Sequence, residues 1–190
     1  MSASVSVVFC LVVAWFVVEF ITGDVLPSLG RGGARIRPMD QGSMMLVNLV
    51  FYPSLATAFV LSNYNIAVLP EWTFYPGLAI FIAGVLLRQW AVLTLGRYYS
   101  EAVGVQEGQP VIDRGPYRRV RHPAYTGVLL ALSGIGLALQ SWGATLLLAA
   151  AFALAFGYRM RVEEKALAVA LGEPYVRYME RTKRLIPFIL

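Results

Sequence analysis

The chain has few charged residues, one cysteine and one histidine. Only 14% of its 190 residues are charged, whereas a soluble domain carries about 25%. The single Cys10 excludes an internal disulfide, and Cys10 and Glu19 are too isolated to form a metal-ligand cluster. We therefore expect no metal site.

Basic residues are absent before the first apolar block, and no small-residue cleavage site follows that block. A signal peptide has a basic start and such a cleavage site, so we expect a retained helix instead. Apolar residues make up 58% of the chain and fall in blocks. This pattern predicts an all-α integral membrane protein, with residues 1–190 forming a single domain.

Five apolar blocks approach the roughly 20 residues that a membrane-spanning helix needs. They cover about residues 5–22, 43–61, 74–95, 125–140 and 144–160. Only the sequence "SWG" separates the last two, which predicts a C-terminal helical hairpin. The fifth helix is expected to continue to about Leu171, where Gly172 provides a stop signal.

Basic residues have an uneven distribution that predicts the orientation. All lysines and arginines except Arg88 lie in the segments 28–42, 96–124 and 159–190, whereas the 62–73 loop has none. Five spans put these three segments on one side, and the positive-inside rule makes that side cytoplasmic. We expect an external N-terminus and a cytoplasmic C-terminus. The net charge of +5 then reflects topology and does not indicate nucleic-acid binding.

The predicted hairpin brings two polar motifs together beside the membrane. They are "GPYRRVRHPAYTG" at 115–127 and "RMRVEE" at 159–164. Each has an ordinary structural explanation, because arginines at a membrane edge serve topology and Glu163 and Glu164 could form a solvated helix face. Their convergence is what favours a functional site. Arg88, inside the third block, fits either a site residue or a side chain that reaches the membrane edge.

The two motifs resemble those of the isoprenylcysteine carboxyl methyltransferase family and, more distantly, of the phospholipid N-methyltransferases. The shared signature is an Arg-His-Pro-x-Tyr-x-Gly box followed by a Glu-Glu pair on the extension of the last helix, and the likeness covers about residues 96–187. The "DQGS" before the second span fits bacterial-type members, so the resemblance implies a prokaryotic cell membrane.

The resemblance implies S-adenosyl-L-methionine as cofactor, in a cytosolic pocket formed by about residues 99–127 and 159–187. The cofactor-binding residues it implies are Gln109, Pro110, Val111, Ile112, Tyr117, His122, Pro123, Ala124, Tyr125 and Glu163. Arg159 would be the catalytic residue that faces the substrate carboxylate. Many relatives have a histidine where this chain has Gln109, and Pro110 lacks a backbone donor.

The residue types at the site favour an acid as methyl acceptor. A carboxylate is ionised near pH 7 and needs an arginine rather than a general base. An amine would need a base, for which Glu164 and His122 are the candidates. We expect carboxyl O-methylation of an isoprenylcysteine-like or other lipid acid, with lipid N-methylation as the alternative. An NADPH-dependent membrane reductase and a non-catalytic scaffold are the alternatives from other classes.

Overall fold

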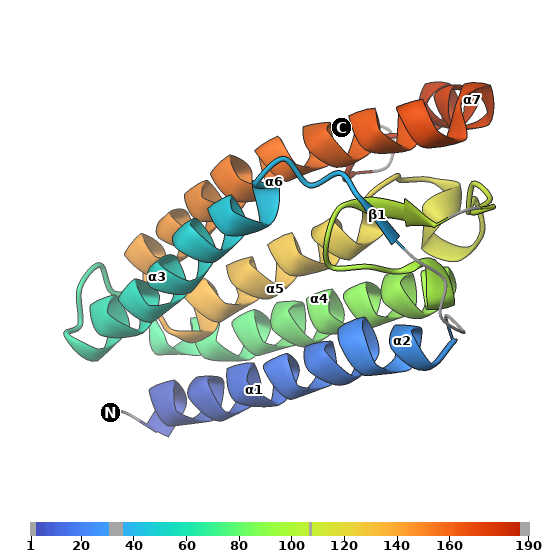
Figure 1. Cartoon of the computed structure of the whole chain (residues 1–190). Helices are drawn as coiled ribbons and strands as arrows, with labels where there is room; N and C mark the ends of the chain where they lie inside the picture. Colours follow the sequence, from blue (N-terminus) through green and yellow to red (C-terminus); the bar gives the residue numbers. More distant parts are fainter. Residues whose placement is uncertain (1–2, 31–35, 107, 187–190) are drawn as a thin grey trace.

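The computed structural model describes residues 3–30, 36–106 and 108–186. Arg31, Arg35 and position 187, which the sequence analysis assigned to basic or cofactor-binding segments, lie outside these ranges. Long helices run side by side and make up most of the described chain (Figure 1). They are α1 (Ala3–Glu19), α3 (Ser43–Asn63), α4 (Phe74–Leu95), α5 (Pro123–Ala138) and α6 (Trp142–Leu171).

Four helical segments of the described chain are long and apolar enough to cross a membrane. They are Ala3–Leu29, Ser43–Asn63, Glu71–Tyr98 and Trp142–Leu171. The segment predicted at 125–140 is also an apolar helix, but α5 has only 16 residues. At 1.5 Å per residue it is about 24 Å long, shorter than the ~30 Å hydrocarbon core. The helical fold is therefore confirmed, and the count of five spans stays a prediction.

The first helix is longer than predicted and changes its winding. After α1 the chain continues as a π-helix over Phe20–Val25 and as the short α2 over Leu26–Gly30. A π-helical turn is rare and accommodates extra residues, so it alters the direction in which the following side chains point. Glu19 is the last residue before this change.

The C-terminal hairpin is present, with a turn two residues earlier than predicted. Leu139, Gln140 and Ser141 form the turn, and the Ser141 hydroxyl accepts a hydrogen bond from the Ala144 amide as the N-cap of α6. At its other end, α6 stops at Leu171, and Gly172 adopts a φ of 66°. A residue in this left-handed conformation ends a helix, which confirms the predicted stop.

The two ends of the helix bundle differ in composition. At one end the loop after α3 meets the hairpin turn, where Trp142 donates its amide to the Ala67 carbonyl. Exposed aromatic side chains surround this end: Tyr64, Trp72, Tyr75 and Trp142. At the other end lie the antiparallel strands β1 (Ile36–Pro38) and β2 (Gly104–Gln106), the 3-10 turns η3 (Gly96–Tyr98) and η4 (Gly115–Arg118), and α7 (Glu173–Arg181). A third 3-10 turn, η2 (Glu71–Thr73), precedes α4.

Glycines bring α4 and α5 into backbone contact. A Cβ at Gly134 would overlap the backbone of Phe81, and one at Gly84 would overlap the backbone of Ala131. A Cβ at Gly127 would overlap Arg88. The Arg-His-Pro-x-Tyr-x-Gly motif at residues 121–127, here named the histidine box, leads into α5. The start of α5 is therefore fixed directly against the end of α4.

Residues 182–186, here named the C-terminal strap, return along the histidine box. The Arg121 amide donates to the Lys183 carbonyl at 2.7 Å, and the His122 amide donates to the Arg184 carbonyl at 3.0 Å. The Thr126 hydroxyl donates to the Leu185 carbonyl at 2.7 Å. The strap thus holds the backbone that leads into α5.

Candidate functional site

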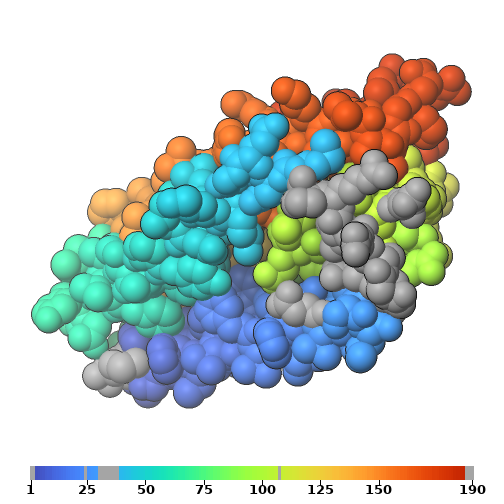
Figure 2. All heavy atoms as spheres, viewed as in Figure 1, coloured from blue at the N-terminus to red at the C-terminus, as the bar shows by residue number. Residues whose placement is uncertain are grey.

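A cavity of about 220 Å3 lies between the bundle and the segments at its polar end. One part of its wall is apolar and comes from α1, α3 and α6: Trp15, Phe16, Val47, Phe51, Tyr52 and Phe156. The other part is more polar and comes from residues 98–112, the histidine box, the end of α6 and α7. Figure 2 shows the face on which α1 in blue, α3 in cyan and segment 98–106 in yellow-green meet. One cavity therefore contacts both membrane-type helices and polar loops.

Every site residue suggested by the sequence, except Pro123, lines this cavity. The lining residues are Gln109, Pro110, Val111, Ile112, Tyr117, His122, Ala124, Tyr125, Arg159 and Glu163. Pro123 is fully buried as the first residue of α5. A proline suits this position because its fixed φ matches the helix and its missing N–H costs nothing there. The role of Pro123 is to start the helix, not to form the wall.

The two adjacent glutamates face different surroundings, because consecutive helical residues are about 100° apart. Glu163 lines the cavity, with its Oε2 bound by the Tyr125 hydroxyl at 2.6 Å. Glu164 is buried, and Arg121 and Arg184 contact its carboxylate at 2.9 and 2.8 Å. Glu164 therefore ties α6 to the histidine box and the strap.

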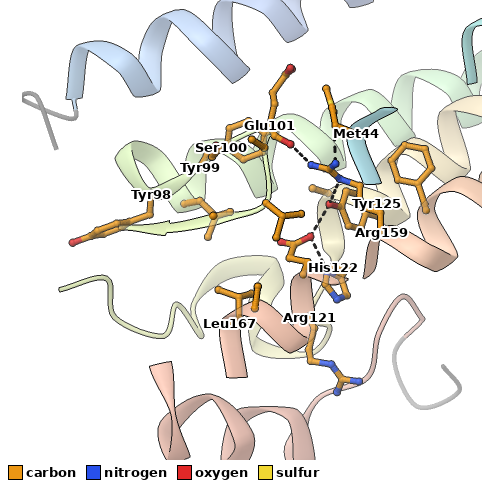
Figure 3. Close-up of a pocket in the computed structure, with 18 of the residues that line it drawn as sticks. Met44, Tyr98, Tyr99, Ser100, Glu101, Arg121, His122, Tyr125, Arg159 and Leu167 are labelled. Atoms are coloured by element: carbon orange, nitrogen blue, oxygen red, sulfur yellow. Dashed lines mark hydrogen bonds and ion pairs between the residues drawn. The ribbon is translucent and has the colours of Figure 1, made fainter. Parts of the chain in front are cut away.

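Arg159 lies at the centre of the site in Figure 3, between Met44, Glu101 and Tyr125. Its Nε donates to the Tyr125 hydroxyl at 2.9 Å, and its Nη2 donates to the Glu101 carbonyl. Its Nη1 contacts Met44 Sδ at 3.6 Å. A guanidinium has five N–H groups, so one Nη2 donor stays open within the described chain.

The "DQGS" motif supplies the remaining contacts of Arg159. Its Nη1 donates to the Ser43 hydroxyl at 3.2 Å and lies 3.6 Å from Asp40 Oδ1. Asp40 in turn accepts the Met44 amide in the first turn of α3. Sequence reasoning noted this motif without assigning it a role, since the contact with α6 exists only in the folded chain.

Tyr125 joins the two parts of the cavity wall. Its ring contacts that of Phe156 on the apolar side, with centroids 5.2 Å apart, and stacks on the His122 ring at 5.3 Å. The His122 ring nitrogens face both glutamates, with Nε2 3.3 Å from Glu164 and Nδ1 3.9 Å from Glu163. The hydroxyl of Tyr125 thus connects Arg159 to Glu163 above this imidazole.

Tyr117 is another tyrosine that lines the polar part of the cavity. Burial raises the pKa of Tyr117 well above the ordinary value, and the negative charge of Glu163 raises it further. The hydroxyl therefore stays protonated at neutral pH and is available as a donor. Gln109 is less available, because its side-chain oxygen accepts the Gln106 amide at 3.1 Å.

Arg88 also lines the cavity, which answers the question that the sequence left open. Its Nε lies 2.7 Å from Oε2 of Glu19 on α1, and its Nη2 donates to the Tyr99 hydroxyl at 3.1 Å. Sequence reasoning missed Glu19, because an isolated acidic residue near a helix end gives no sign of a distant partner. Arg88 therefore lines the cavity together with Arg121 and Arg159.

The donors and acceptors of the polar part suit S-adenosyl-L-methionine. Its ammonium needs an anionic acceptor, and Glu163 has its Oε1 without a hydrogen bond within the described chain. Its adenine and ribose need apolar surface and polar atoms, which Ile112 and Tyr117 offer. These residues fit such a ligand by their chemistry.

Comparisons with known proteins give the same family as the motifs. A profile of the isoprenylcysteine carboxyl methyltransferase (ICMT) family matches residues 77–169. The chain is 27% identical over 146 residues to protein-S-isoprenylcysteine O-methyltransferase B of Arabidopsis thaliana, covering 76% of this chain and 68% of that protein. It is 30% identical over 125 residues to the uncharacterised protein YpbQ of Bacillus subtilis, covering 65% of this chain and 71% of that one.

A solved structure has the same arrangement of helices. The structure of the eukaryotic intramembrane Ras methyltransferase ICMT aligns with a TM-score of 0.64 and 26% identity. The alignment covers 75% of this chain, and the chain spans about half, 52%, of that protein. Together with the four apolar helices, this likeness indicates an integral membrane protein. From the family profile, the relatives and the shared fold, we conclude that the chain belongs to the isoprenylcysteine carboxyl methyltransferase family.

Proposed function

We propose that the protein is an S-adenosylmethionine-dependent methyltransferase that esterifies the carboxylate of a lipophilic, isoprenylcysteine-like acid in the membrane. The observation that carries this proposal is the cavity with two kinds of wall, in which Tyr125 and Arg159 lie where the walls meet. A polar cofactor and a hydrocarbon-rich acceptor need such opposite surroundings in one space.

On the cofactor side we propose that Glu163 binds the ammonium group. The Tyr117 hydroxyl would bind a polar atom of the adenine or ribose. Residues 109–112 and Ala124 complete the wall, largely through backbone and apolar surface. When bound, the cofactor supplies a methyl group on a positively charged sulfonium. The protein's task is then to align this group with the acceptor, which is how an enzyme accelerates a direct displacement.

On the acceptor side we propose that Arg159 binds the carboxylate through its open Nη2 donor. Arg88 would attract the same negative charge. The acceptor carboxylate is ionised at pH 7, so no general base is required. Its lipid chain would lie against the apolar wall formed by Phe51, Tyr52 and Phe156. Exclusion of water by this wall strengthens the attraction between the arginines and the carboxylate.

The contacts of the glutamates favour an acid over an amine acceptor. An amine must lose a proton to a base before it attacks. Glu164, one candidate base, does not line the cavity, and its carboxylate is bound by Arg121 and Arg184. His122 is buried and its Nε2 faces Glu164. Neither candidate base is therefore free to take a proton from an acceptor.

We further propose that five spans place the polar end of the bundle in the cytoplasm and the N-terminus outside. The aromatic side chains at the opposite end are typical of a membrane–water interface, and the lysines and arginines at the polar end favour the cytoplasmic side. The cofactor would then enter from water and the acceptor from the bilayer.

Calorimetry on the detergent-solubilised protein tests the cofactor class. We expect S-adenosylhomocysteine to bind and NADPH not to bind. Transfer of a labelled methyl group to N-acetyl-S-farnesylcysteine, compared with transfer to a total lipid extract, then tests the acceptor. Binding of NADPH alone, or of neither compound, would contradict the proposal.

A further inference from the structure

A buried carboxylate stands against Arg88, one of the three arginines that line the cavity. Glu19 is 8% exposed, and its Oε2 lies 2.7 Å from Arg88 Nε. No other residue of the described chain forms a hydrogen bond with either of these two atoms. At these atoms the carboxylate and the guanidinium are therefore paired only with each other.

Neutral donors hold Glu19 in place independently of Arg88. The Trp15 indole N–H donates to Glu19 Oε1 at 2.7 Å, and the Gln89 amide donates to the same oxygen at 2.8 Å. Gln89 is itself held by the Thr22 hydroxyl, from the π-helical turn, at 2.6 Å. The carboxylate therefore keeps two hydrogen bonds if Arg88 turns to another anion.

Arg88 likewise keeps a partner outside the ion pair. Its Nη2 donates to the Tyr99 hydroxyl at 3.1 Å, and its guanidinium has further N–H groups. Both Arg88 and Glu19 line the cavity, next to the apolar wall at Trp15 and Phe16. A carboxylate that enters along this wall would reach Arg88 beside Glu19.

Two carboxylates next to one guanidinium repel each other, so an entering acid must displace Glu19 from Arg88. Methylation converts the acid into a neutral ester, which no longer competes for the arginine. We propose that Glu19 is an exchangeable counter-ion of Arg88, which yields to the acceptor carboxylate and re-pairs with Arg88 once the ester forms. This inference rests on the proposed function and makes Glu19 a positioning residue that favours release of the product.

The exchange links α1 to acceptor selectivity. Residues 77–169, which match the family profile, contain Arg88, whereas Glu19 lies outside them. The selectivity between acid and ester would therefore depend on a helix other than those that carry the histidine box and the Glu-Glu pair.

The test compares the parent protein with Glu19→Gln, whose amide can still accept the bonds from Trp15 and Gln89. The full chain in detergent is titrated with two pairs of probes. One pair is N-acetyl-S-farnesylcysteine and its methyl ester, and the other is a long-chain fatty acid and its methyl ester. We expect the acids to bind about tenfold or more tightly to the variant, since one ionic hydrogen bond is worth at least that factor. The esters should stay within about twofold.

Glu101→Gln is the matched control, because Glu101 is another carboxylate that lines the cavity. An equal tightening in this control would mean a general charge effect and would overturn the exchange. The double variant Glu19→Gln, Arg88→Gln should lose the tightening seen in Glu19→Gln, as expected if the effect passes through Arg88, while Arg159 still attracts the acid. If Glu19→Gln does not fold, Glu19→Asp keeps the charge but shortens the side chain, and a smaller tightening is expected.

Unchanged or weaker binding of acids to the Glu19 variants overturns the inference, as does failure of every acid to bind. Tighter binding of acids without any methyl transfer by the parent protein would instead reject the proposed function and leave the counter-ion exchange in place.

Discussion

Replacing Glu163 and Glu164 by glutamine, one at a time, should produce two different defects: weaker cofactor binding for Glu163→Gln and lower stability for Glu164→Gln. Glu163→Gln removes a charge from the cavity wall, where its partner is the neutral Tyr125 hydroxyl. An amide oxygen can still accept that bond, so we expect the free energy of unfolding to change by less than about 1 kcal/mol. Loss of the charged contact to a cofactor ammonium should weaken S-adenosylhomocysteine binding about ten- to hundredfold, which corresponds to about 1.5–3 kcal/mol.

Glu164→Gln should instead lower stability. The side chain of Arg121 is only 12% exposed, so losing its ionic hydrogen bond costs about 1.5–3 kcal/mol. The side chain of Arg184 is 44% exposed, and solvent screening reduces its share to about 0–1 kcal/mol. We expect a total loss of about 1.5–4 kcal/mol.

Thermal unfolding in detergent and calorimetry with S-adenosylhomocysteine measure the two effects separately. Binding to Glu164→Gln should be compared below its unfolding temperature, where we expect an affinity within a few-fold of the parent. The assignment of the two glutamates is refuted if Glu163→Gln binds like the parent while Glu164→Gln loses binding without loss of stability.

Three further variants or fusions test other parts of the structure. Arg159→Lys keeps the charge but loses the planar set of donors. We expect methyl transfer to fall at least tenfold, about 1.4 kcal/mol, while cofactor affinity stays within a few-fold of the parent. A matching loss of cofactor affinity would place Arg159 on the donor side. Gly134→Val introduces a side chain against the backbone of Phe81 and should destabilise the protein by about 1–3 kcal/mol, whereas Gly157→Ala, in open space, should be neutral or stabilising by thermal unfolding. Reporter fusions should place the N-terminus outside and the C-terminus in the cytoplasm, and a cytoplasmic N-terminus would contradict five spans.

Hydrophobic blocks made the helices predictable, because a membrane helix needs a continuous apolar run that few other structures share. The hairpin and the stop after Leu171 followed from local signals at "SWG" and Gly172. The length of α5 did not follow, because apolar residues continue through Leu139 into the turn. Composition shows where a helix can lie, and hydrogen bonds of the turn decide where it ends.

The site was predictable where a motif lies on one element and not where distant segments meet. Glu163 and the histidine box stand within recognisable motifs, and helical geometry alone separates Glu163 from Glu164. Glu19 and Asp40 contact their arginines only after the bundle has formed. Tyr99 likewise reaches Arg88 through a turn whose path the sequence does not reveal.

The C-terminal strap has a consequence for biosynthesis. A ribosome releases the chain from its N-terminus onward, so Arg121 and His122 leave it well before Lys183 and Arg184 do. Until the strap emerges, the amides of Arg121 and His122 lack the carbonyls to which they donate in the folded protein. The backbone that carries His122 is therefore among the last parts of the described chain to reach its folded hydrogen bonding.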